Sequence, residues 1–411
     1  MKTRIHTRTT CRLCGADNLR RFLHLPNLPF TDEFVTAEQR GREFAADLDV
    51  FFCPACRSAQ TLHDVEAHDY YRAYGYTVSA SPFAQQFMTR LAEATRDRFA
   101  LQPGDNVLEV GSGDGFQLAC FQQLEANVLG FEPSDVLCEA SQARGVPVQP
   151  GLFTAETAGK VPAELRPAHV MLLAYTFDHL PEPRAFLDAV RPLLDPQRGV
   201  LIIEVHDLEQ IIARRETCLF EHEHTIYLHR GSMRRLLEQA GFKLLTADLL
   251  PATQRRGNSL LIAAAPQTTI HAADERATAG ERNPLDDWPV YAEFAAQAEQ
   301  SFERLRAHVG TQRAQGRRVA GYGAGGRGVM TLAMAGLTAA DVAFLCDRNT
   351  GCHGRYTPVT HIPVVPPEQL ATEPIDEVVV FSYGYMDEIR AAGRAVEERG
   401  GRFVSLLDLL Q

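Results

Sequence analysis

Residues 106–132 read NVLEVGSGDGFQLACFQQLEANVLGFE, and this stretch decides the fold of the central part of the chain. An apolar run leads into a glycine-rich turn, a helical stretch and a second apolar run, which ends at Glu132. That order predicts a buried strand, a helix and a second strand, with a ligand lying over the turn. Glycines let the backbone of such a turn bend sharply and come close to the ligand. A carboxylate at the end of the second strand can accept both hydroxyls of a ribose.

The spacing of the glycines separates two kinds of nucleotide site. Dinucleotide sites use G-x-G-x-x-G, whereas this turn reads Glu109-x-Gly111-x-Gly113-x-Gly115, with an acid inside the strand. This pattern resembles the class I S-adenosylmethionine-dependent methyltransferases. The resemblance implies that Glu109 and the three glycines hold the methionine end of the cofactor and that Glu132 holds its ribose. The alternative is a turn that only joins a strand to a helix.

Composition limits the class of protein. At 411 residues and 45% hydrophobic, the chain is long enough for two or three domains with their own cores. Its net charge of −11 makes nucleic acid a poor partner. No stretch approaches the ~20 apolar residues that span a bilayer, and the polar start MKTRIHTRTT lacks the apolar core of a signal peptide. We therefore predict a cytoplasmic protein that binds neither membranes nor nucleic acid.

Four of the nine cysteines are paired as metal ligands usually are. Cys11-x-x-Cys14 and Cys53-x-x-Cys56 each set two sulfurs where they can face one ion. Two such pairs suit tetrahedral zinc, and four thiolates leave no position for a reacting water. We expect this zinc to serve folding. The other five cysteines are interpreted as packing or surface thiols: Cys120, Cys138, Cys218, Cys346 and Cys352.

The predicted fold class is α/β, with three parts. Residues 1–68 form a small zinc-binding module, residues 69–265 a central Rossmann-like domain, and residues 266–411 a second Rossmann-like domain. Strands and helices alternate from about residue 106 to residue 264, which favours a mostly parallel, doubly wound sheet. Further elements are expected as a helix at 182–194, a strand at 200–205, a polar linker at 266–289 and a long helix at 290–309.

A second glycine turn lies in the C-terminal part. Residues 318–328 read RVAGYGAGGRG and repeat the order of strand, glycine turn and helix. Backbone N–H groups at the start of the helix could bind a phosphate. The glycines could equally allow tight packing, so both interpretations remain open.

Ionisable side chains follow two predicted strands at their carboxyl ends, where open α/β sheets bind ligands. The fourth strand leads into YTFDH at 175–179, and the fifth is followed by EHEH at 221–224. A metalloprotease pair needs histidines four apart on a helix, whereas His222 and His224 are two apart, so we interpret the second run as acid–base machinery. Three neighbouring groups are interpreted as structural: Glu204, His206 and His229.

The cysteine pairs, the cofactor turn with its Glu-His pair, and the C-terminal glycine turn together resemble the sugar C-methyltransferases of antibiotic deoxysugar pathways. The resemblance covers nearly the whole chain. It implies a zinc-binding N-terminal domain, a methyltransferase domain, a Rossmann-like C-terminal domain, and a nucleotide-linked 4-keto sugar that is methylated at C-3. The family's Glu-His pair falls on Glu223 and His224, its histidine after the fourth strand on His179, and its active-site tyrosine on Tyr76.

Methylation at carbon needs a base and an enolate stabiliser, because the carbon becomes nucleophilic only after it loses a proton beside a ketone. Under the resemblance, His224 is the base and Glu223 orients it or binds a substrate hydroxyl. Tyr76 and His179 donate hydrogen bonds to the carbonyl oxygen. His222 is the rival base. Substrate contacts are expected from Glu221, His222, Gly323 and Arg327.

Two positions depart from the family's pattern. Glu221 stands where members usually have tyrosine, and Arg327 where they commonly have lysine. Both differences concern substrate contacts, so they bear on the sugar more than on the chemistry. Two other functions remain open: a small-molecule O-methyltransferase that deprotonates a hydroxyl, and a zinc-bearing binding module that keeps the cofactor fold without catalysis.

Overall fold

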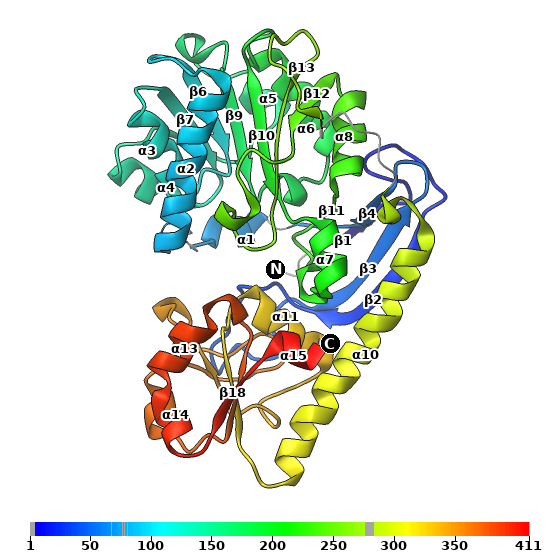
Figure 1. Ribbon diagram of the computed structural model, residues 1–411, viewed down its shortest axis with the longest axis vertical. Coiled ribbons are helices and arrows are strands. Elements are labelled where there is room, and N and C mark those ends of the chain that lie inside the picture. The colour runs from blue at the N-terminus through cyan, green and yellow to red at the C-terminus, as the bar shows by residue number, and fades with distance from the viewer. Residues whose placement is uncertain are drawn as a thin grey trace.

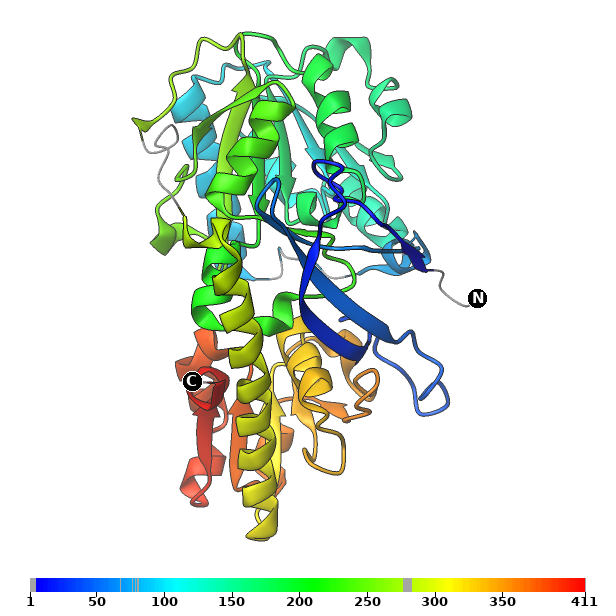
Figure 2. The ribbon, with the colours of Figure 1, turned by 90° about the vertical axis from the view of Figure 1, so that its right-hand side faces the viewer.

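The computed structural model describes residues 5–66, 68–75, 77, 79, 81–275 and 283–410. Within these ranges the strands form four sheets. Figure 1 shows the central sheet with its helices in the upper half, the C-terminal sheet in the lower half, and the N-terminal strands between them at one side. Figure 2 shows the long helix α10 (Trp288–Ala314) running along the C-terminal half of the molecule.

The N-terminal module is an antiparallel sheet in the order β11-β4-β3-β2, accompanied by the two-stranded pair β1-β5. Leu48, Val50 and Phe52 alternate along one strand and are buried, as expected where one face of a sheet packs on a core. The edge strand β11 comes from the central part of the chain, where Ile226 pairs with Gln60. The strands are β1 (Ile5–Thr7), β2 (Arg20–Leu28), β3 (Ala46–Cys53), β4 (Ser58–Thr61), β5 (His63–Val65) and β11 (Ile226–Tyr227).

The central sheet has the order β12-β13-β10-β9-β6-β7-β8. The strands from β10 to β8 are parallel, and β13 pairs antiparallel with β10 and β12, which confirms the mostly parallel sheet. Val107 and Leu108 belong to different hydrophobic clusters, so both faces of the sheet are buried. The strands are β6 (Asn106–Val110), β7 (Asn127–Glu132), β8 (Val148–Pro150), β9 (Val170–Ala174), β10 (Val200–Val205), β12 (Phe242–Thr246) and β13 (Leu260–Pro266).

The helices of this region agree with the expected alternation, with one difference. The helix expected at 182–194 ends at Val190, and a 3₁₀ turn at Arg191–Leu193 follows it, because Pro192 has no N–H to continue the helix. The helices are α1 (His68–Ala73), α2 (Pro82–Phe99), α3 (Phe116–Gln122), α4 (Asp135–Ala143), α5 (Ala155–Ala158), α6 (Pro183–Val190), α7 (Leu208–Arg214) and α8 (Arg230–Gln239).

The C-terminal sheet has the order β16-β15-β14-β17-β18, and all its neighbouring strands are parallel. This confirms the second Rossmann-like unit. Helix α10 begins at Trp288, slightly before the expected position, because Pro289 is well tolerated in the first turn of a helix. The other elements are β14 (Val319–Tyr322), α11 (Gly326–Ala335), β15 (Leu345–Cys346), β16 (Val364–Val365), α12 (Gln369–Thr372), β17 (Glu377–Val380), α13 (Met386–Ala392), α14 (Arg394–Glu398), β18 (Arg402–Ser405) and α15 (Leu406–Leu410).

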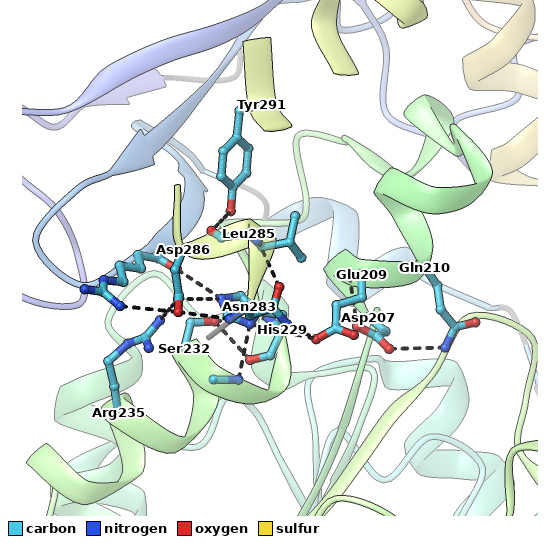
Figure 3. Close-up of polar contacts among 12 residues, drawn as sticks. Asp207, Glu209, Gln210, His229, Ser232, Arg235, Asn283, Leu285, Asp286 and Tyr291 are labelled. Atoms are coloured by element: carbon cyan, nitrogen blue, oxygen red, sulfur yellow. Dashed lines mark hydrogen bonds and ion pairs between the residues drawn. The ribbon is translucent and has the colours of Figure 1, made fainter. Parts of the chain in front are cut away.

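A polar network ties the start of the C-terminal part to the central domain (Figure 3). Arg235 of α8 donates to Asp286 at 2.7 Å, and Tyr291 of α10 donates to the carbonyl oxygen of Leu285 at 2.9 Å. His229 caps α8 by accepting from the N–H of Gly231. His229 is therefore a structural group, as expected. Among the described residues we find no helix that has both the length and the apolar character needed to cross a bilayer.

Candidate active site

The four paired cysteines come together at one point. Sγ of Cys11 lies 3.6 Å from Sγ of Cys56, and Sγ of Cys14 lies 3.6 Å from Sγ of Cys53. Tetrahedral zinc with Zn–S bonds of about 2.3 Å holds its sulfurs about 3.8 Å apart, so the spacing fits the ion. Gln60 donates from Nε2 to Sγ of Cys11 at 2.9 Å, as groups around a thiolate ligand commonly do. These residues fit a closed, structural zinc site.

The three glycines of the central turn have different reasons to be glycine. All three have positive φ angles. A Cβ on Gly111 would clash with the side chain of Thr176, and one on Gly115 would clash with Ser141, so these two positions allow close packing. A Cβ on Gly113 would meet nothing within 4 Å. The open space over Gly113 is where a ligand above the turn would lie.

Two buried carboxyl groups flank this space. Glu132 ends β7 and is held by backbone N–H groups: Oε2 accepts from Gly113 at 2.9 Å and Oε1 from Ser134 at 2.8 Å. Glu109 lies inside β6 with 3% of its surface exposed, and its Oε2 has no hydrogen-bond partner among the described residues. Burial raises the pKa of Glu109 well above its ordinary value. A buried carboxyl group that lacks a partner is suited to an ammonium group of a ligand.

Glu204, at the end of β10, is fully buried and accepts from Ser259 at 2.8 Å. It also pairs with Arg256, whose guanidinium stacks on Tyr175. This carboxylate is satisfied by its neighbours, which agrees with the structural role expected for it.

Residues 221–224 form a turn, closed by the N–H of His224 donating to the carbonyl of Glu221 at 3.3 Å. In an extended strand His222 and His224 would share one side. The turn separates them instead. Nδ1 of His224 lies 2.9 Å from the carbonyl oxygen of Leu219, which can only accept. Nδ1 therefore carries the proton, and Nε2 keeps its lone pair.

His222 points into the N-terminal sheet. Its Nε2 lies 3.1 Å from the carbonyl oxygen of Leu28 and 3.2 Å from that of Ala46, and its ring packs against Phe44. Burial lowers the pKa of His222 to about 4. In this structure His222 joins the N-terminal sheet to the turn, and its contact with a substrate stays a prediction.

His179 lies beside His224, with ring centroids 4.8 Å apart. Its Nδ1 is 3.0 Å from the hydroxyl of Tyr71, a residue of α1. Burial lowers the pKa of His179 to about 3 and raises that of Tyr71, so the imidazole is neutral and the phenol keeps its proton. When the phenol donates to Nδ1, the proton of the neutral ring is on Nε2. Tyr76, the expected active-site tyrosine, lies outside the described residues.

His206, which we interpreted as structural, also belongs to this cluster. It is the first residue after β10, and its ring centroid is 4.8 Å from that of His224. Its Nδ1 lies 3.0 Å from Oδ2 of Asp178, the residue before His179. The sequence signal that could have found the pair is its position, because both residues follow carboxyl ends of adjacent parallel strands.

Three carboxyl groups line the other side of the cluster. Oε1 of Glu223 accepts from the N–H of Thr31 at 3.2 Å, and its Oε2 is buried and unpartnered among the described residues. We expected Glu223 to orient His224 or to bind a substrate hydroxyl, and in the structure the carbonyl oxygen of Leu219 is the group that contacts Nδ1 of His224. Burial and the charge of Glu223 raise the pKa of Asp32 to about 6. Burial likewise raises the pKa of Glu221 well above its ordinary value.

The C-terminal glycine turn meets this region from the opposite side. A Cβ on Gly326, at the start of α11, would lie 3.2 Å from Oε1 of Glu221. Arg327 donates to Glu216 at 3.1 Å and stacks on Tyr383. A Cβ on Gly323 would clash with Ser382. Close packing therefore explains Gly323, whereas Arg327 sits between the two Rossmann-like units.

Comparisons with known protein families match three successive stretches of the chain. Family models match residues 11–71 ("Putative zinc binding domain"), 84–247 ("Methyltransferase domain") and 254–407 ("C-methyltransferase C-terminal domain"). The chain is an S-adenosylmethionine-dependent methyltransferase, and it is similar to C-methyltransferases. It is 29% identical to C-methyltransferase NovU of Streptomyces niveus over 402 residues, which is 96% of this chain and 94% of the relative.

Solved structures match part of this methyltransferase. Magnesium protoporphyrin IX methyltransferase from Synechocystis PCC 6803, with bound SAH, is 16% identical, with a TM-score of 0.36 over 45% of this chain and 84% of that chain. The CcbJ methyltransferase from Streptomyces caelestis is 17% identical, with a TM-score of 0.34 over 51% of this chain and 96% of that chain.

The cofactor of this methyltransferase is S-adenosylmethionine, and the residues around the central turn fit it. Glu132 is held in place to accept from ribose hydroxyls, the space over Gly113 is open, and the unpartnered carboxyl group of Glu109 suits the ammonium of the methionine end. The role of each residue toward the cofactor remains a prediction.

Glu132→Ala is expected to weaken binding of S-adenosylmethionine by on the order of 1.5–3 kcal/mol for each charge-assisted hydrogen bond that is lost. Titration calorimetry measures this effect. Glu125→Ala serves as the control, because Glu125 lies outside the turn, between α3 and β7. Unchanged affinity in Glu132→Ala would show that another group holds the ribose.

Proposed function

We propose that this S-adenosylmethionine-dependent C-methyltransferase acts on a carbon next to a ketone, namely C-3 of a nucleotide-linked 4-keto deoxysugar in a secondary-metabolite pathway. The observation that carries the proposal is His224, a buried imidazole whose Nε2 has no hydrogen-bond partner among the described residues and whose ring lies beside the neutral His179. Removal of a proton from carbon needs such a base close to a donor for the developing oxygen charge.

His224 takes the proton from the substrate carbon through Nε2. The hydrogen bond from Nδ1 to Leu219 fixes both the ring orientation and the tautomer. Imidazole is well suited to this work at neutral pH. The electron pair of the broken C–H bond moves into the enolate, whose negative charge develops on the carbonyl oxygen.

His179 donates from Nε2 to that oxygen. Tyr71 supports the assignment, because its hydroxyl donates to Nδ1 and leaves the ring proton on Nε2. A donor aimed at a developing oxyanion typically contributes ~3 kcal/mol to lowering the barrier. Tyr76 is proposed as a further donor on the family resemblance alone.

The bound cofactor supplies a sulfonium methyl group for the carbon nucleophile. Glu223 binds a substrate hydroxyl through its free Oε2. Glu221 lies beside Gly326 and Arg327 pairs with Glu216, both where the two Rossmann-like units meet, and we assign Glu221 and Arg327 to the substrate's sugar and phosphate groups respectively. Arginine is a strong ligand for phosphate.

Product analysis tests the proposed function. The protein is incubated with S-adenosylmethionine and nucleotide-linked 4-keto sugars, and the products are examined by NMR. A new methyl singlet on carbon is the expected result. An O-methyl resonance would replace the proposal with an O-methyltransferase, and cofactor binding without any product from these sugars would overturn the proposed substrate class.

A further inference from the structure

Asp178, which is buried, and His206, which is partly buried, form a pair that the proposed chemistry does not use. Oδ2 of Asp178 lies 3.0 Å from Nδ1 of His206 and also accepts from the N–H of His206 at 3.4 Å. Burial disfavours the charge on Asp178, but the hydrogen bond from His206 and the surrounding imidazoles hold its pKa below the ordinary value. Asp178 is therefore a carboxylate, so Nδ1 of His206 is the donor and Nε2 keeps a lone pair.

This pair faces the proposed base. The rings of His206 and His224 have centroids 4.8 Å apart at an interplanar angle of 46°. One ring nitrogen of each histidine and one carboxylate oxygen of Asp178 all lie within 4.8 Å of one another. A single oxygen that hydrogen-bonds to both rings can span about 5.6 Å. One hydroxyl can therefore bridge one ring nitrogen of His206 and one ring nitrogen of His224.

His206 is also more exposed to solvent than the base is. The side chain of His206 has 19% of its surface exposed, whereas that of His224 has 6%. His224 is thus the inner imidazole and His206 the outer one, and Asp178 is hydrogen-bonded to His206.

The same three residues could form the donor set of a metal ion, but their hydrogen bonds argue against it. Nδ1 of His206 already donates to Asp178 and Nδ1 of His224 already donates to Leu219. A separation of 3.0 Å between Nδ1 of His206 and Oδ2 of Asp178 is an ordinary charge-assisted hydrogen bond.

We propose that Asp178 and His206 form a proton-accepting dyad that regenerates His224 after each turnover. The inference rests on the proposed function, in which His224 removes the proton from carbon. His206 is then a catalytic residue that exchanges the proton, and Asp178 is a positioning residue.

The proton balance explains the need for such a dyad. The substrate carbon loses a proton to Nε2 of His224 and gains a methyl group, while the sulfur–methyl bond breaks with its electron pair going to sulfur. The product carbon takes no proton back, so His224 ends the turnover as an imidazolium. Nε2 of His206 accepts that proton through one bridging hydroxyl group of water or substrate. Asp178 stabilises the resulting imidazolium, and the proton leaves to solvent.

Kinetics of the first and later turnovers test the dyad. His206→Asn keeps a side-chain amide that can donate to Asp178, and Asp178→Asn keeps the size of the partner. His169→Asn is the matched control, because Nε2 of His169 pairs with Asp105 at 3.2 Å at the other end of β9. For each variant we would measure methyl transfer in a single turnover, steady-state kcat, and exchange of the substrate's α-hydrogen with D₂O in the presence of the demethylated cofactor.

We expect the first-turnover rate to be nearly unchanged and the steady-state kcat and the exchange rate to fall. His206→Asn and Asp178→Asn should keep a first-turnover rate within about threefold of the wild type, while kcat and exchange fall at least about tenfold, toward the range typical of acid–base residues. His169→Asn should change none of the three. His206→Gln with the same readouts replaces His206→Asn if the latter folds poorly.

Three outcomes would overturn parts of the inference. Equal loss of first-turnover rate and kcat would show that the pair acts on the carbon proton or only on structure. Unchanged kcat and exchange in both variants would remove the dyad but leave His224 as the base. A wild-type protein that neither exchanges nor methylates 4-keto sugars would overturn the proposed function, and the dyad with it.

Discussion

His224→Ala is expected to lower kcat by the ~10²–10⁴ that a general base contributes, while leaving the affinity for S-adenosylmethionine unchanged. The reason is that Nε2 of His224 supplies the lone pair that takes the proton, and the hydrogen bond from Nδ1 to Leu219 orients the ring. The cofactor turn is formed by other residues, so the substitution leaves it intact. Exchange of the substrate's α-hydrogen with D₂O, measured with the demethylated cofactor bound, should be lost in the same variant.

His222→Ala is the matched control for this prediction. Its imidazole lies two residues away but is tied to Leu28 and Ala46, so the variant should lose stability while keeping kcat close to that of the wild type. If exchange persists in His224→Ala and disappears in His179→Ala, the carbon proton leaves by another route and the assignment of His224 is wrong.

The second large effect concerns zinc. Cys53→Ser is expected to impair folding more than methyl transfer by the folded protein. The reason is that binding of structural zinc by four thiolates contributes roughly 10–16 kcal/mol to the stability of the folded state. Cys11, Cys53 and Cys56 belong to the same hydrophobic cluster as the core of the central sheet. The damage should therefore reach the methyltransferase domain, and we expect poor solubility or a strongly lowered melting temperature.

Metal analysis and thermal melts measure this effect. Freshly purified protein should contain close to one zinc ion per chain, in accord with a single tetrahedral site. Cys138→Ser is the control, because Cys138 is a buried thiol of α4 outside the cluster. Folded, active protein without metal would contradict the zinc site.

Local sequence patterns predicted much of the fold. The strand expected at 200–205 has those bounds, and both glycine turns join a strand to a helix. These elements are decided by apolar runs and glycines that lie next to one another in the chain. The pairing of β11 with β4 joins Ile226 to Gln60, and no local pattern carries such a distant contact.

The candidate site was predicted only in part, because local patterns indicate which residues follow a strand but not which distant residues lie beside them. Sequence placed His179 and His224 together through their positions after parallel strands, and the structure brings their rings into contact. Sequence could not separate His222 from His224, because a turn, and not an extended segment, holds residues 221–224. His206 was assigned to structure because sequence could not show that Asp178 would lie beside it.

Strand β11 belongs to the central part of the sequence but pairs with a strand of the N-terminal module. The segment that carries His224 continues directly into a strand hydrogen-bonded to the module that holds the cysteines. Chimeras between members of the family would therefore fail if they were joined only at the sequence borders of the zinc module. A successful chimera must take residues 219–229 from the same parent as the module. The turn that carries His224 and the sheet that carries the cysteines then come from one protein.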